Sequence, residues 1–586
     1  MTVISSSSQF DRRALLGAGI GGAGLLATGC SIFDSGSGGG GGGGGDGEDG
    51  PAITIARTSD IDSLDPHYVN SSMYILPASM MEGLVMQDES GSDVVPALAE
   101  SWDVSEDELT YTFHLRQANW SNGDPVTAED AVWSFQRLLS PTGAGSGYTT
   151  GASSYLPSVG IRGAAEYQSG ALEAWEDVGV TAPDDSTVVI ELESPNPDLL
   201  LNMTHYSMSV LHPPTVEAEP QDWTLPENWV GNGPYVLTDW VPNSTLEMEK
   251  NPEYWDADNV QVQRITVQLA GELTTQTLAF RNDELDIIGV TGETLQTDPD
   301  LEESAVRVDG YSTFYLQSMW GGHEAIQDQR VRRAISMAID REAMTATNAG
   351  IMAAGSLIPD TVPGWSDELL VPFDPDGARA LLEETGVADD LPGLRIQAGY
   401  EEPILEIMRE GLIDVLGLDV AIDVLEEGVQ AETRWQPHDD ADVMSFYYGS
   451  FAGVSTMPNW IFNIFGSDHV RQFSMPYEAW EELQAVQADE SLEGPEVAAQ
   501  VEEILSSRST DEAQQYAELA EDAMSTLDED ERARKFIDAA ALREELAYTI
   551  PLAWGAQLLA GSDRLDGIQL RPSPEGYYYK HLTVSE

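Results

Sequence analysis

The chain has 586 residues, of which 41% are hydrophobic and 8% aromatic, so it can bury large apolar cores and is not disordered as a whole. Its 101 acidic residues against 27 basic ones give a formal net charge of −74, which repels phosphate groups and argues against nucleic acid as a partner. A single cysteine excludes an internal disulfide framework and any cysteine-rich metal site.

The negative charge also indicates the solvent in which the protein works. At ordinary ionic strength such self-repulsion destabilises a compact state, whereas molar salt shortens the Debye length to about 3 Å and screens the charges. Only Lys250, Lys535 and Lys580 are lysines. A GC-rich genome would deplete lysine too, but it would not create the acid excess. We therefore interpret the composition as an adaptation to high salt, typical of halophilic archaea.

Residues 1–30 have the layout of an export signal. Arg12 and Arg13 precede an apolar, glycine-rich stretch that closes with small residues before Cys30. Paired arginines indicate the twin-arginine route. Small residues before a lone cysteine resemble a lipoprotein cleavage box, although Ala27 stands where that pattern prefers leucine, and they predict that the Cys30 thiol receives a lipid. The alternative is an uncleaved membrane helix over 14–33, which six glycines in that stretch disfavour.

Residues 31–51 follow as a predicted flexible tether, with an unbroken glycine run at 38–45. Roughly fifteen glycine-rich residues behave as a coil with about 20 Å of slack. No later segment is long and apolar enough to span a membrane. These features predict a globular body outside the cytoplasmic membrane, held at the cell surface by a lipid on Cys30.

The body begins with residues of strand-like and helix-like pattern. Residues 53–56 and 109–116 alternate between apolar and polar, which predicts two strands. A turn at 122–125 leads to Thr127, which caps a predicted helix together with Asp130. We expect this strand, turn and helix to build the fold without contacting a ligand.

Several short sequence blocks follow one another along the chain. They are LAESW, SEDELTYTFHLR, WSNGDP and TAED between Pro96 and Asp130, GNGPY at 231–235, NPEYW at 251–255, DQRVRRAI with AIDR at 328–341, and FDP with ARALL at 373–382. These blocks resemble the signature of the family 5 extracellular solute-binding proteins, the peptide/nickel class that serves ABC importers. The resemblance runs from about residue 53 to residue 584.

The resemblance implies an α/β, two-lobed periplasmic-binding-protein-like fold with hinge strands and an extra subdomain in the first lobe. A ligand would sit between the lobes, which close by hinge motion. The chain would cross outward near 311–317 and return near 549–554. The expected units are lobe I at 52–312 with its subdomain at about 96–229, lobe II at 313–552 with an acidic, solvated helix pair inserted at about 484–515, and a return to lobe I at 553–586.

One helix illustrates how these blocks also have a purely structural interpretation. The block at 328–341 places Val331, Ile335, Ala338 and Ile339 on one face, which predicts core packing. Its arginines are expected to be solvated.

Two segments would line the cleft if the chain follows its relatives. In relatives that bind peptides, extended backbone in both segments pairs with the ligand main chain. The expected ligand-binding residues are Asn70, Ser71 and Ser72 in the first lobe and Gly449, Ser450, Phe451, Ala452, Gly453 and Val454 in the second.

Val454 marks a departure from the relatives. They place an aspartate four residues before the proline at position 458, where it accepts the α-ammonium of the ligand. Here that position is Val454, and no acidic residue lies between Asp442 and Asp468. The sequence therefore predicts that a charged peptide N-terminus gains little in this cleft, and that N-acetylation of a peptide costs little affinity.

Other classes of function have weaker support. The eight histidines are scattered, without a His-Glu-x-x-His spacing, and chance alone brings carboxylates together in so acidic a chain, so a hydrolase is the least favoured alternative. His438 with Asp439, Asp440 and Asp442 could bind a metal or a nickel complex, but it reads more simply as a solvated loop. Aromatic residues near 447–465 could stack on sugar rings, so an oligosaccharide remains an alternative ligand.

The sequence thus favours a non-enzymatic substrate-binding protein that captures an oligopeptide or similar oligomeric organic solute and delivers it to an ABC transporter permease. We expect a monomer without a cofactor. A surface sensor without a transport role would have the same sequence features.

Overall fold

The structure is a computed structural model, and it describes residues 50–585 with a set of gaps. The predicted export signal, including Cys30, and nearly all of the predicted tether lie outside the described residues. The longest gaps are 68–74, 141–159 and 572–577. The shorter gaps are 59, 62, 89–90, 92, 169, 173, 197, 270, 347, 349, 388–390, 400–401, 427–428, 431–432, 434–435, 439, 441, 453–455, 464–465, 490–491, 493 and 527.

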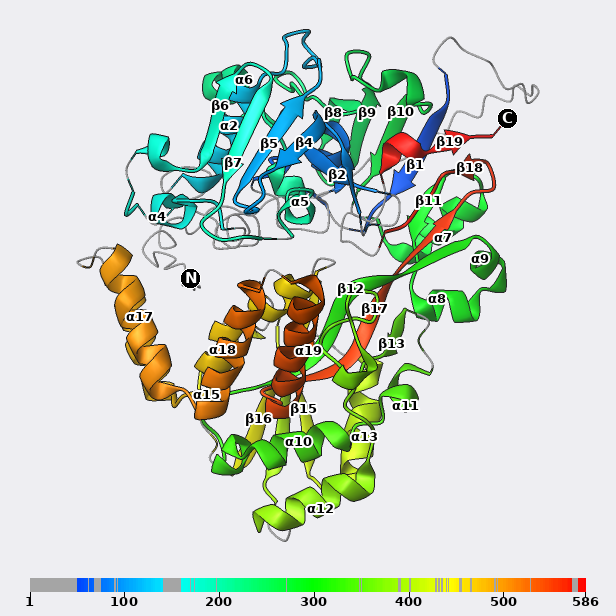
Figure 1. Ribbon diagram of the computed structural model, residues 1–586. Helices are drawn as coiled ribbons and strands as arrows, with labels where there is room; N and C mark the ends of the chain where they lie inside the picture. Colours follow the sequence, from blue (N-terminus) through cyan, green and yellow to red (C-terminus); the bar gives the residue numbers. More distant parts are fainter. Residues whose placement is uncertain are drawn as a thin grey trace, which may run out of the picture.

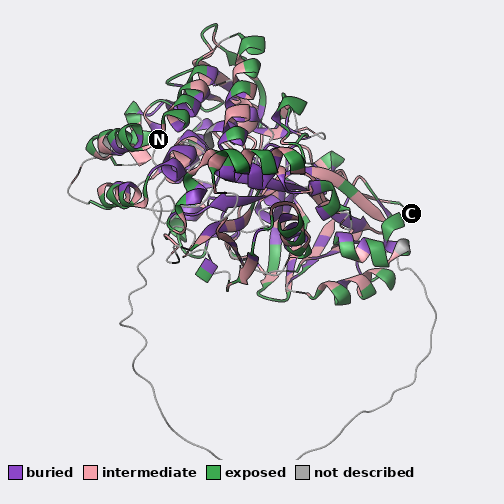
Figure 2. Cartoon of the chain, turned by 90° about the horizontal axis from the view of Figure 1, so that it is seen from below, coloured by how far each residue is buried: buried purple, intermediate pink, exposed green. Residues whose placement is uncertain are grey.

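The chain forms two lobes that share one mixed sheet (Figure 1). The strand order is β15-β14-β16-β12-β17-β11-β1-β10-β9-β8, and β13 pairs with β17 beside this path. Figure 2 shows that buried residues concentrate in the central strands, whereas exposed residues lie on the outer sides of the helices. The predicted α/β class is confirmed. The strands of this sheet are β1 (Ala52–Ala56), β8 (Tyr235–Val241), β9 (Thr245–Lys250), β10 (Arg264–Gln268), β11 (Ile287–Gly289), β12 (Ala305–Ser318), β13 (Ile351–Ala353), β14 (Gly393–Ala398), β15 (Val420–Val424), β16 (Val443–Ala452) and β17 (Thr549–Gly561).

Two long strands, β12 and β17, run from one lobe into the other. They pair in antiparallel register along most of their lengths, with a register shift between Asp309 and Ser312. β12 also pairs with β16 of the second lobe, and β17 with β11 of the first. The predicted changes of lobe after residue 312 and after residue 552 fall within these two strands.

A separate four-stranded sheet lies in the first lobe, within the range predicted for the subdomain. Its order is β4-β5-β7-β6, and α2 packs against it. The predicted capping box of α2 is confirmed: Thr127 Oγ1 accepts from the Asp130 N–H, and Asp130 Oδ2 accepts from the Thr127 N–H at 2.9 Å. The elements of the first lobe outside the large sheet include β2 (Val85–Gln87), β3 (Val94–Pro96), β4 (Ala99–Val104), β5 (Thr110–Leu115), β6 (Val180–Asp184), β7 (Thr187–Glu191), β18 (Leu565–Asp566), β19 (Thr583–Val584), α1 (Ile75–Met80), α2 (Ala128–Leu139), α4 (Ala164–Gln168), α5 (Leu199–Asn202), α6 (Pro213–Ala218), α7 (Leu273–Arg281), α8 (Gly292–Thr297) and α9 (Pro299–Glu303).

The second lobe surrounds its part of the sheet with helices. They are α10 (Gln329–Met337), α11 (Arg341–Thr345), α12 (Pro375–Thr385), α13 (Pro403–Leu416), α15 (Ser467–Ser474), α16 (Tyr477–Gln487), α17 (Gly494–Arg508), α18 (Asp511–Met524) and α19 (Glu529–Leu546). The predicted solvated helix pair at 484–515 covers the end of α16, all of α17 and the start of α18. It is not solvated on all sides, because Ile504 and Leu505 pack against Leu483.

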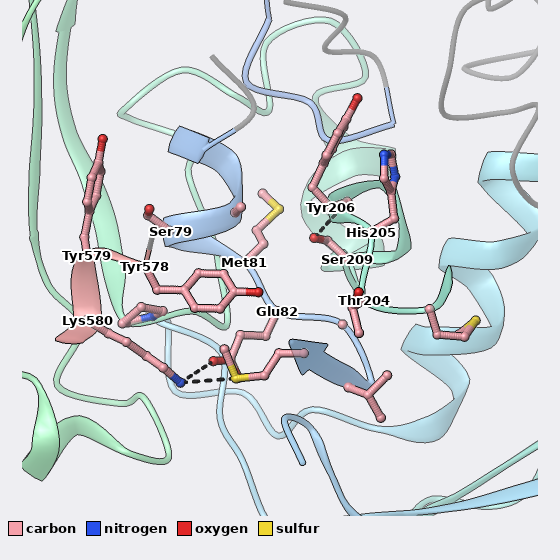
Figure 3. Close-up of a pocket in the computed structure, with 16 residues that line it drawn as sticks. Ser79, Met81, Glu82, Thr204, His205, Tyr206, Ser209, Tyr578, Tyr579 and Lys580 are labelled. Atoms are coloured by element: carbon pink, nitrogen blue, oxygen red, sulfur yellow. Dashed lines mark hydrogen bonds and ion pairs between the residues drawn. The ribbon is translucent and has the colours of Figure 1, made fainter. Parts of the chain in front are cut away.

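The C-terminal segment returns to the first lobe and joins its core. Lys580, which is only 9% exposed, places its Nζ 3.6 Å from the buried carboxylate of Glu82 and 3.4 Å from Met86 Sδ (Figure 3). The Nε1–H of Trp255 donates to the other oxygen of Glu82 at 2.9 Å, and the Tyr254 hydroxyl donates to Glu82 Oε1. A buried charge that is paired and hydrogen-bonded in this way holds the C-terminal segment against the lobe.

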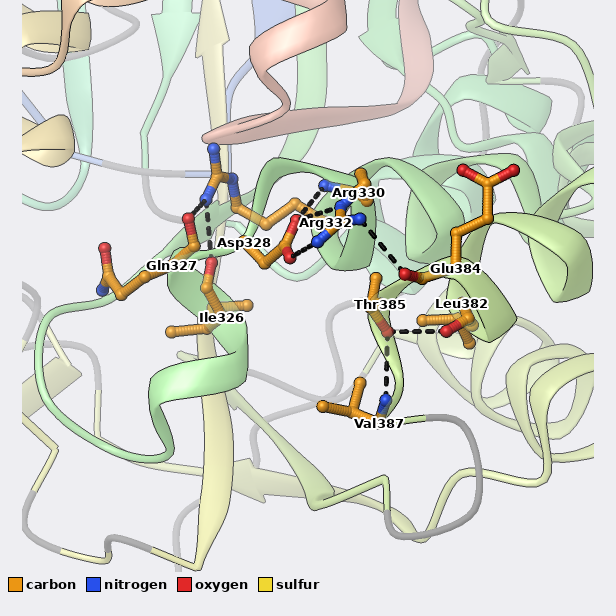
Figure 4. A network of polar contacts seen from close by, with 9 residues as sticks. All are labelled: Ile326, Gln327, Asp328, Arg330, Arg332, Leu382, Glu384, Thr385 and Val387. Carbon is orange, nitrogen blue, oxygen red and sulfur yellow. Dashed lines mark hydrogen bonds and ion pairs between the residues drawn. The ribbon is translucent and has the colours of Figure 1, made fainter.

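The helix block at 328–341 corrects one prediction. Val331 and Ile335 are buried as expected, and Arg333 is about half exposed, but Arg332 and Arg341 are 1% and 5% exposed rather than solvated. The guanidinium of Arg332 donates to three backbone carbonyls at 2.8–3.0 Å, those of Ile326 and Gln327 (Figure 4) and that of Leu546. It also lies 3.8 Å from the ring centroid of Tyr548. The side chain can be buried because these carbonyls accept the hydrogen bonds of its guanidinium.

The described residues contain neither a membrane-spanning helix nor a metal-ligand cluster. None of the described helices is long and apolar enough to cross a membrane. Within the same residues no group of three or more His, Cys, Asp or Glu could hold a metal ion, and Asp439 of the metal alternative lies outside them.

Candidate functional site

The end of β16 is an unpaired sheet edge next to the strands that join the lobes. β14 pairs with β16 as far as Tyr447, whereas β12 pairs with it as far as Ala452. The Nε2–H₂ group of Gln430 covers the next position, because it donates to Tyr448 O at 2.9 Å. Among the described strands, only β12 therefore pairs with Gly449, Ser450, Phe451 and Ala452.

The direction of the backbone groups follows from Gln430. The carbonyl of Tyr448 points away from β12, and alternate residues of a strand direct their backbone groups to the same side. Ser450 and Ala452 therefore present N–H and C=O groups at the unpaired edge. An edge of this kind can accept an added extended segment.

Aromatic rings border this edge. Phe451 is 40% exposed, and its ring meets the buried ring of Trp460 edge-on, at 6.5 Å between centroids. Gly449 has no side chain because a Cβ there would meet the Tyr447 ring at 2.6 Å and the Tyr315 hydroxyl at 2.9 Å. The edge thus combines open backbone groups with an exposed aromatic face.

A turn at Asp65–His67 precedes the first-lobe segment of the predicted site. Asp65 accepts both the His67 N–H at 2.9 Å and a two-pronged ion pair from Arg137. Arg137 Nη1 also donates to His67 Nδ1 at 2.8 Å, and burial together with this charge lowers the pKa of His67 to about 3. The turn therefore fixes the chain directly before the predicted ligand residues.

The predicted residues are only partly placed. Gly449, Ser450, Phe451 and Ala452 lie together on β16. Asn70, Ser71, Ser72, Gly453 and Val454 lie outside the described residues, so their role stays a prediction.

The ionisation of Asp198, a residue that the sequence did not single out, is influenced by residues of the second lobe. Asp198, directly before α5, interacts with the side chain of Thr456, which follows β16 in the second lobe. The charge of Arg532 on α19 also acts on Asp198. Burial outweighs both partners and raises the pKa of Asp198 to about 6. The sequence pattern could not predict this interaction, because Asp198 and Thr456 are far apart in the chain and belong to different lobes.

A pocket in the first lobe is distinct from this edge. It is lined by Met81, Met86, Met203 and His205 together with the Glu82–Lys580 pair (Figure 3). None of Gly449, Ser450, Phe451 and Ala452 lines it, and the described residues that do line it belong to one lobe. We therefore do not assign it the ligand.

The chain is similar in sequence to known binding proteins. Residues 93–472 match the model of the bacterial extracellular solute-binding proteins, family 5. The chain is 31% identical over 405 residues to the periplasmic oligopeptide-binding protein OppA of Salmonella typhimurium, which covers 66% of this chain and 70% of that protein. It is 30% identical over 374 residues to the dipeptide-binding protein DppE of Bacillus subtilis, which covers 61% and 66%.

Solved structures have the same fold. The Escherichia coli murein tripeptide binding protein MppA superposes with a TM-score of 0.70 at 23% identity, over 92% of this chain and 99% of that one. Haemophilus influenzae OppA in complex with the peptide RPPGFSPFR gives a TM-score of 0.68 at 20% identity, over 92% and 100%. The predicted two-lobed periplasmic-binding-protein-like fold is thereby confirmed.

Proposed function

Because the chain belongs to family 5 of the bacterial extracellular solute-binding proteins, we propose that it captures an oligopeptide or similar oligomeric organic solute between its lobes and delivers it to an ABC transporter permease. The observation that carries this proposal is the side of β16 at Ser450 and Ala452 that pairs with none of the described strands, beside the two strands that join the lobes. Named relatives are binding proteins for oligopeptides and dipeptides, which supports binding without turnover.

The edge can be tested by one substitution. Proline at position 450 removes an N–H from the open side of β16 but none of the bonds to β12, so Ser450→Pro should lower peptide affinity by at least about tenfold. Affinity for a pool of short peptides is measured by thermal shift and calorimetry in molar KCl. Ser450→Ala is the matched control, because it removes only the hydroxyl and should bind as the wild type does. Equal affinity of the proline variant would refute strand addition at this edge, and a wild type that binds no peptide would refute the proposed function.

We further propose that the body is held outside the cytoplasmic membrane by a lipid on Cys30, after export by the twin-arginine route. This proposal rests on Arg12, Arg13, the apolar stretch and the lone cysteine. Cys30→Ser should move the protein from the membrane fraction to the medium or leave it unprocessed, as shown by fractionation and intact mass. Membrane retention of a correctly cleaved Cys30→Ser protein would contradict lipidation. Normal secretion after replacing Arg12 and Arg13 by lysine would contradict the twin-arginine route.

A further inference from the structure

Asn243 lies in the exposed turn that joins β8 to β9, at one end of the large sheet (Figure 1). The N–H of Ser244 donates to Val241 O at 3.0 Å and closes the turn, with Pro242 and Asn243 at its corners. Asn243 has a φ of 57°. A positive φ directly after proline is typical of a type II turn, where glycine and asparagine are preferred. All of 241–244 is exposed, so another macromolecule can reach this turn.

The side chain of Asn243 has no structural partner. Its backbone N–H donates to Asp60 Oδ2 at 2.9 Å and fixes the turn. Within the part of the chain that the structure describes, its side-chain amide makes no hydrogen bond. Tolerance of a positive φ accounts for an asparagine here without any use of that amide. A chemical change at Nδ2 would therefore break no contact of the described fold.

Asn243 also begins a triplet that can be modified. Asn243-Ser244-Thr245 has the pattern Asn-x-Ser/Thr, without proline in the middle, which is the acceptor for N-linked glycosylation in exported proteins. The pattern is short, and chance alone produces it in a long chain. The sequence contains four such triplets, which begin at Asn70, Asn119, Asn202 and Asn243. Exposure in the folded protein distinguishes between them.

The other described triplets are built into the fold. Asn119 Nδ2, the atom that would carry a sugar, donates to Glu253 Oε2 at 3.0 Å, and Trp120 in the middle of that triplet is 1% exposed. Asn202 ends α5, and its Oδ1 is shielded from water. Asn70 lies outside the described residues. Of the three described triplets, only the one at Asn243 combines an exposed asparagine with an amide that the fold does not use.

We infer that Asn243 is a glycosylation site, which receives an oligosaccharide from a lipid-phosphate carrier at the outer face of the membrane. Asn243 Nδ2 forms a bond to the anomeric carbon of the first sugar and gives up one proton. The bond from that carbon to the carrier's phosphate oxygen breaks, and the lipid phosphate leaves with the electron pair. The inference rests on the export proposed above, and it adds a covalent modification that solute binding does not require. Because the twin-arginine route exports folded proteins, the exposed turn is the form that the transferase meets.

The test uses the full-length protein made in its own host and recovered from the membrane fraction and the medium. Cleavage after acidic residues releases residues 240–247, and mass spectrometry weighs this peptide and locates any added group. The wild-type peptide should exceed its sequence mass by the mass of an oligosaccharide. Thr245→Val removes the hydroxyl of the triplet and should abolish the added mass. Thr245→Ser restores a triplet and should retain it.

Two further variants guard against misfolding and against modification elsewhere. Asn243→Gly keeps the turn, because glycine adopts a φ of 57° readily, so this variant should fold as the wild type does and lose the added mass. Asn119→Gln removes the other triplet with an exposed asparagine and should leave the mass of the 240–247 peptide unchanged.

The outcomes separate this inference from the proposed export. An unmodified Asn243 in a protein that has left the cytoplasm would overturn the inference, whereas the export would stand. Added mass that persists in Thr245→Val would also overturn it, because the triplet would then not direct the modification. An uncleaved chain retained in the cytoplasm would overturn the export and the inference together.

Discussion

Arg332→Met should lower the free energy of unfolding by about 4 kcal/mol. Each buried carbonyl left without a donor costs about 1–3 kcal/mol, and three carbonyls lose the guanidinium, while methionine recovers part of the apolar burial. One of these carbonyls, Leu546 O, belongs to the last residue of α19, where helix carbonyls lack an intrahelical donor, so the loss also weakens that end of the helix. Because the entropy of unfolding grows with chain length, in a body of this size the change corresponds to a fall in melting temperature of about 4 °C. Urea unfolding and calorimetry in molar KCl measure both quantities.

The neighbouring arginine provides the control. Arg333 is about half exposed and pairs loosely with Glu545 at 3.5 Å, so Arg333→Met should change stability by less than about 1 kcal/mol. A loss of the same size in both variants would show that the net charge of α10, and not the capped carbonyls, sets the effect.

Stability should fall as the pH drops from about 6.5 towards 3, with His67 as a main cause. The folded protein holds the pKa of His67 at about 3, below its usual 6.5, because burial and Arg137 disfavour the imidazolium. The unfolded chain takes up the proton below pH 6.5, so the stabilisation is complete above that value and is lost on acidification. At pH 5 this one group accounts for a loss of about 2 kcal/mol. Urea unfolding at constant molar salt, between about pH 7.5 and 5, measures the slope.

A variant tests whether His67 causes the dependence of stability on pH. His67→Gln loses the contact between the imidazole and Arg137 and should be less stable at about pH 7.5, but its stability should decline less on acidification. His114→Gln removes an exposed imidazole and should keep the wild-type decline. If His67→Gln retains the full decline, the proton is taken up elsewhere.

Local patterns predicted local structure well. The alternation at 109–116 and the capping pair Thr127 and Asp130 became β5 and the start of α2, because both depend on neighbouring residues only. Arg332 was misjudged although a signal existed, since positions 332, 335 and 339 share one helical face. Charge was taken as a sign of solvent exposure, whereas the carbonyl at the end of α19 requires a buried donor.

The site was predictable only in part. The β16 segment was identified by resemblance. Which of its backbone groups lack a partner strand depends on where β14 ends, and the sequence of β16 alone does not predict that pairing. The raised pKa of Asp198 could not have been predicted. Nothing in its local sequence distinguishes it from the other 100 acidic residues, and the shift comes from burial in the folded protein.

The shared sheet has a consequence for how the chain can be divided. Because β12 and β17 are central strands of the large sheet, that sheet does not end at the border of either lobe. A fragment cut between the lobes would expose a long row of unpaired N–H and C=O groups, which is a template for association with other chains. The two lobes are therefore mechanically distinct but not separable, and any engineered binding module must retain both.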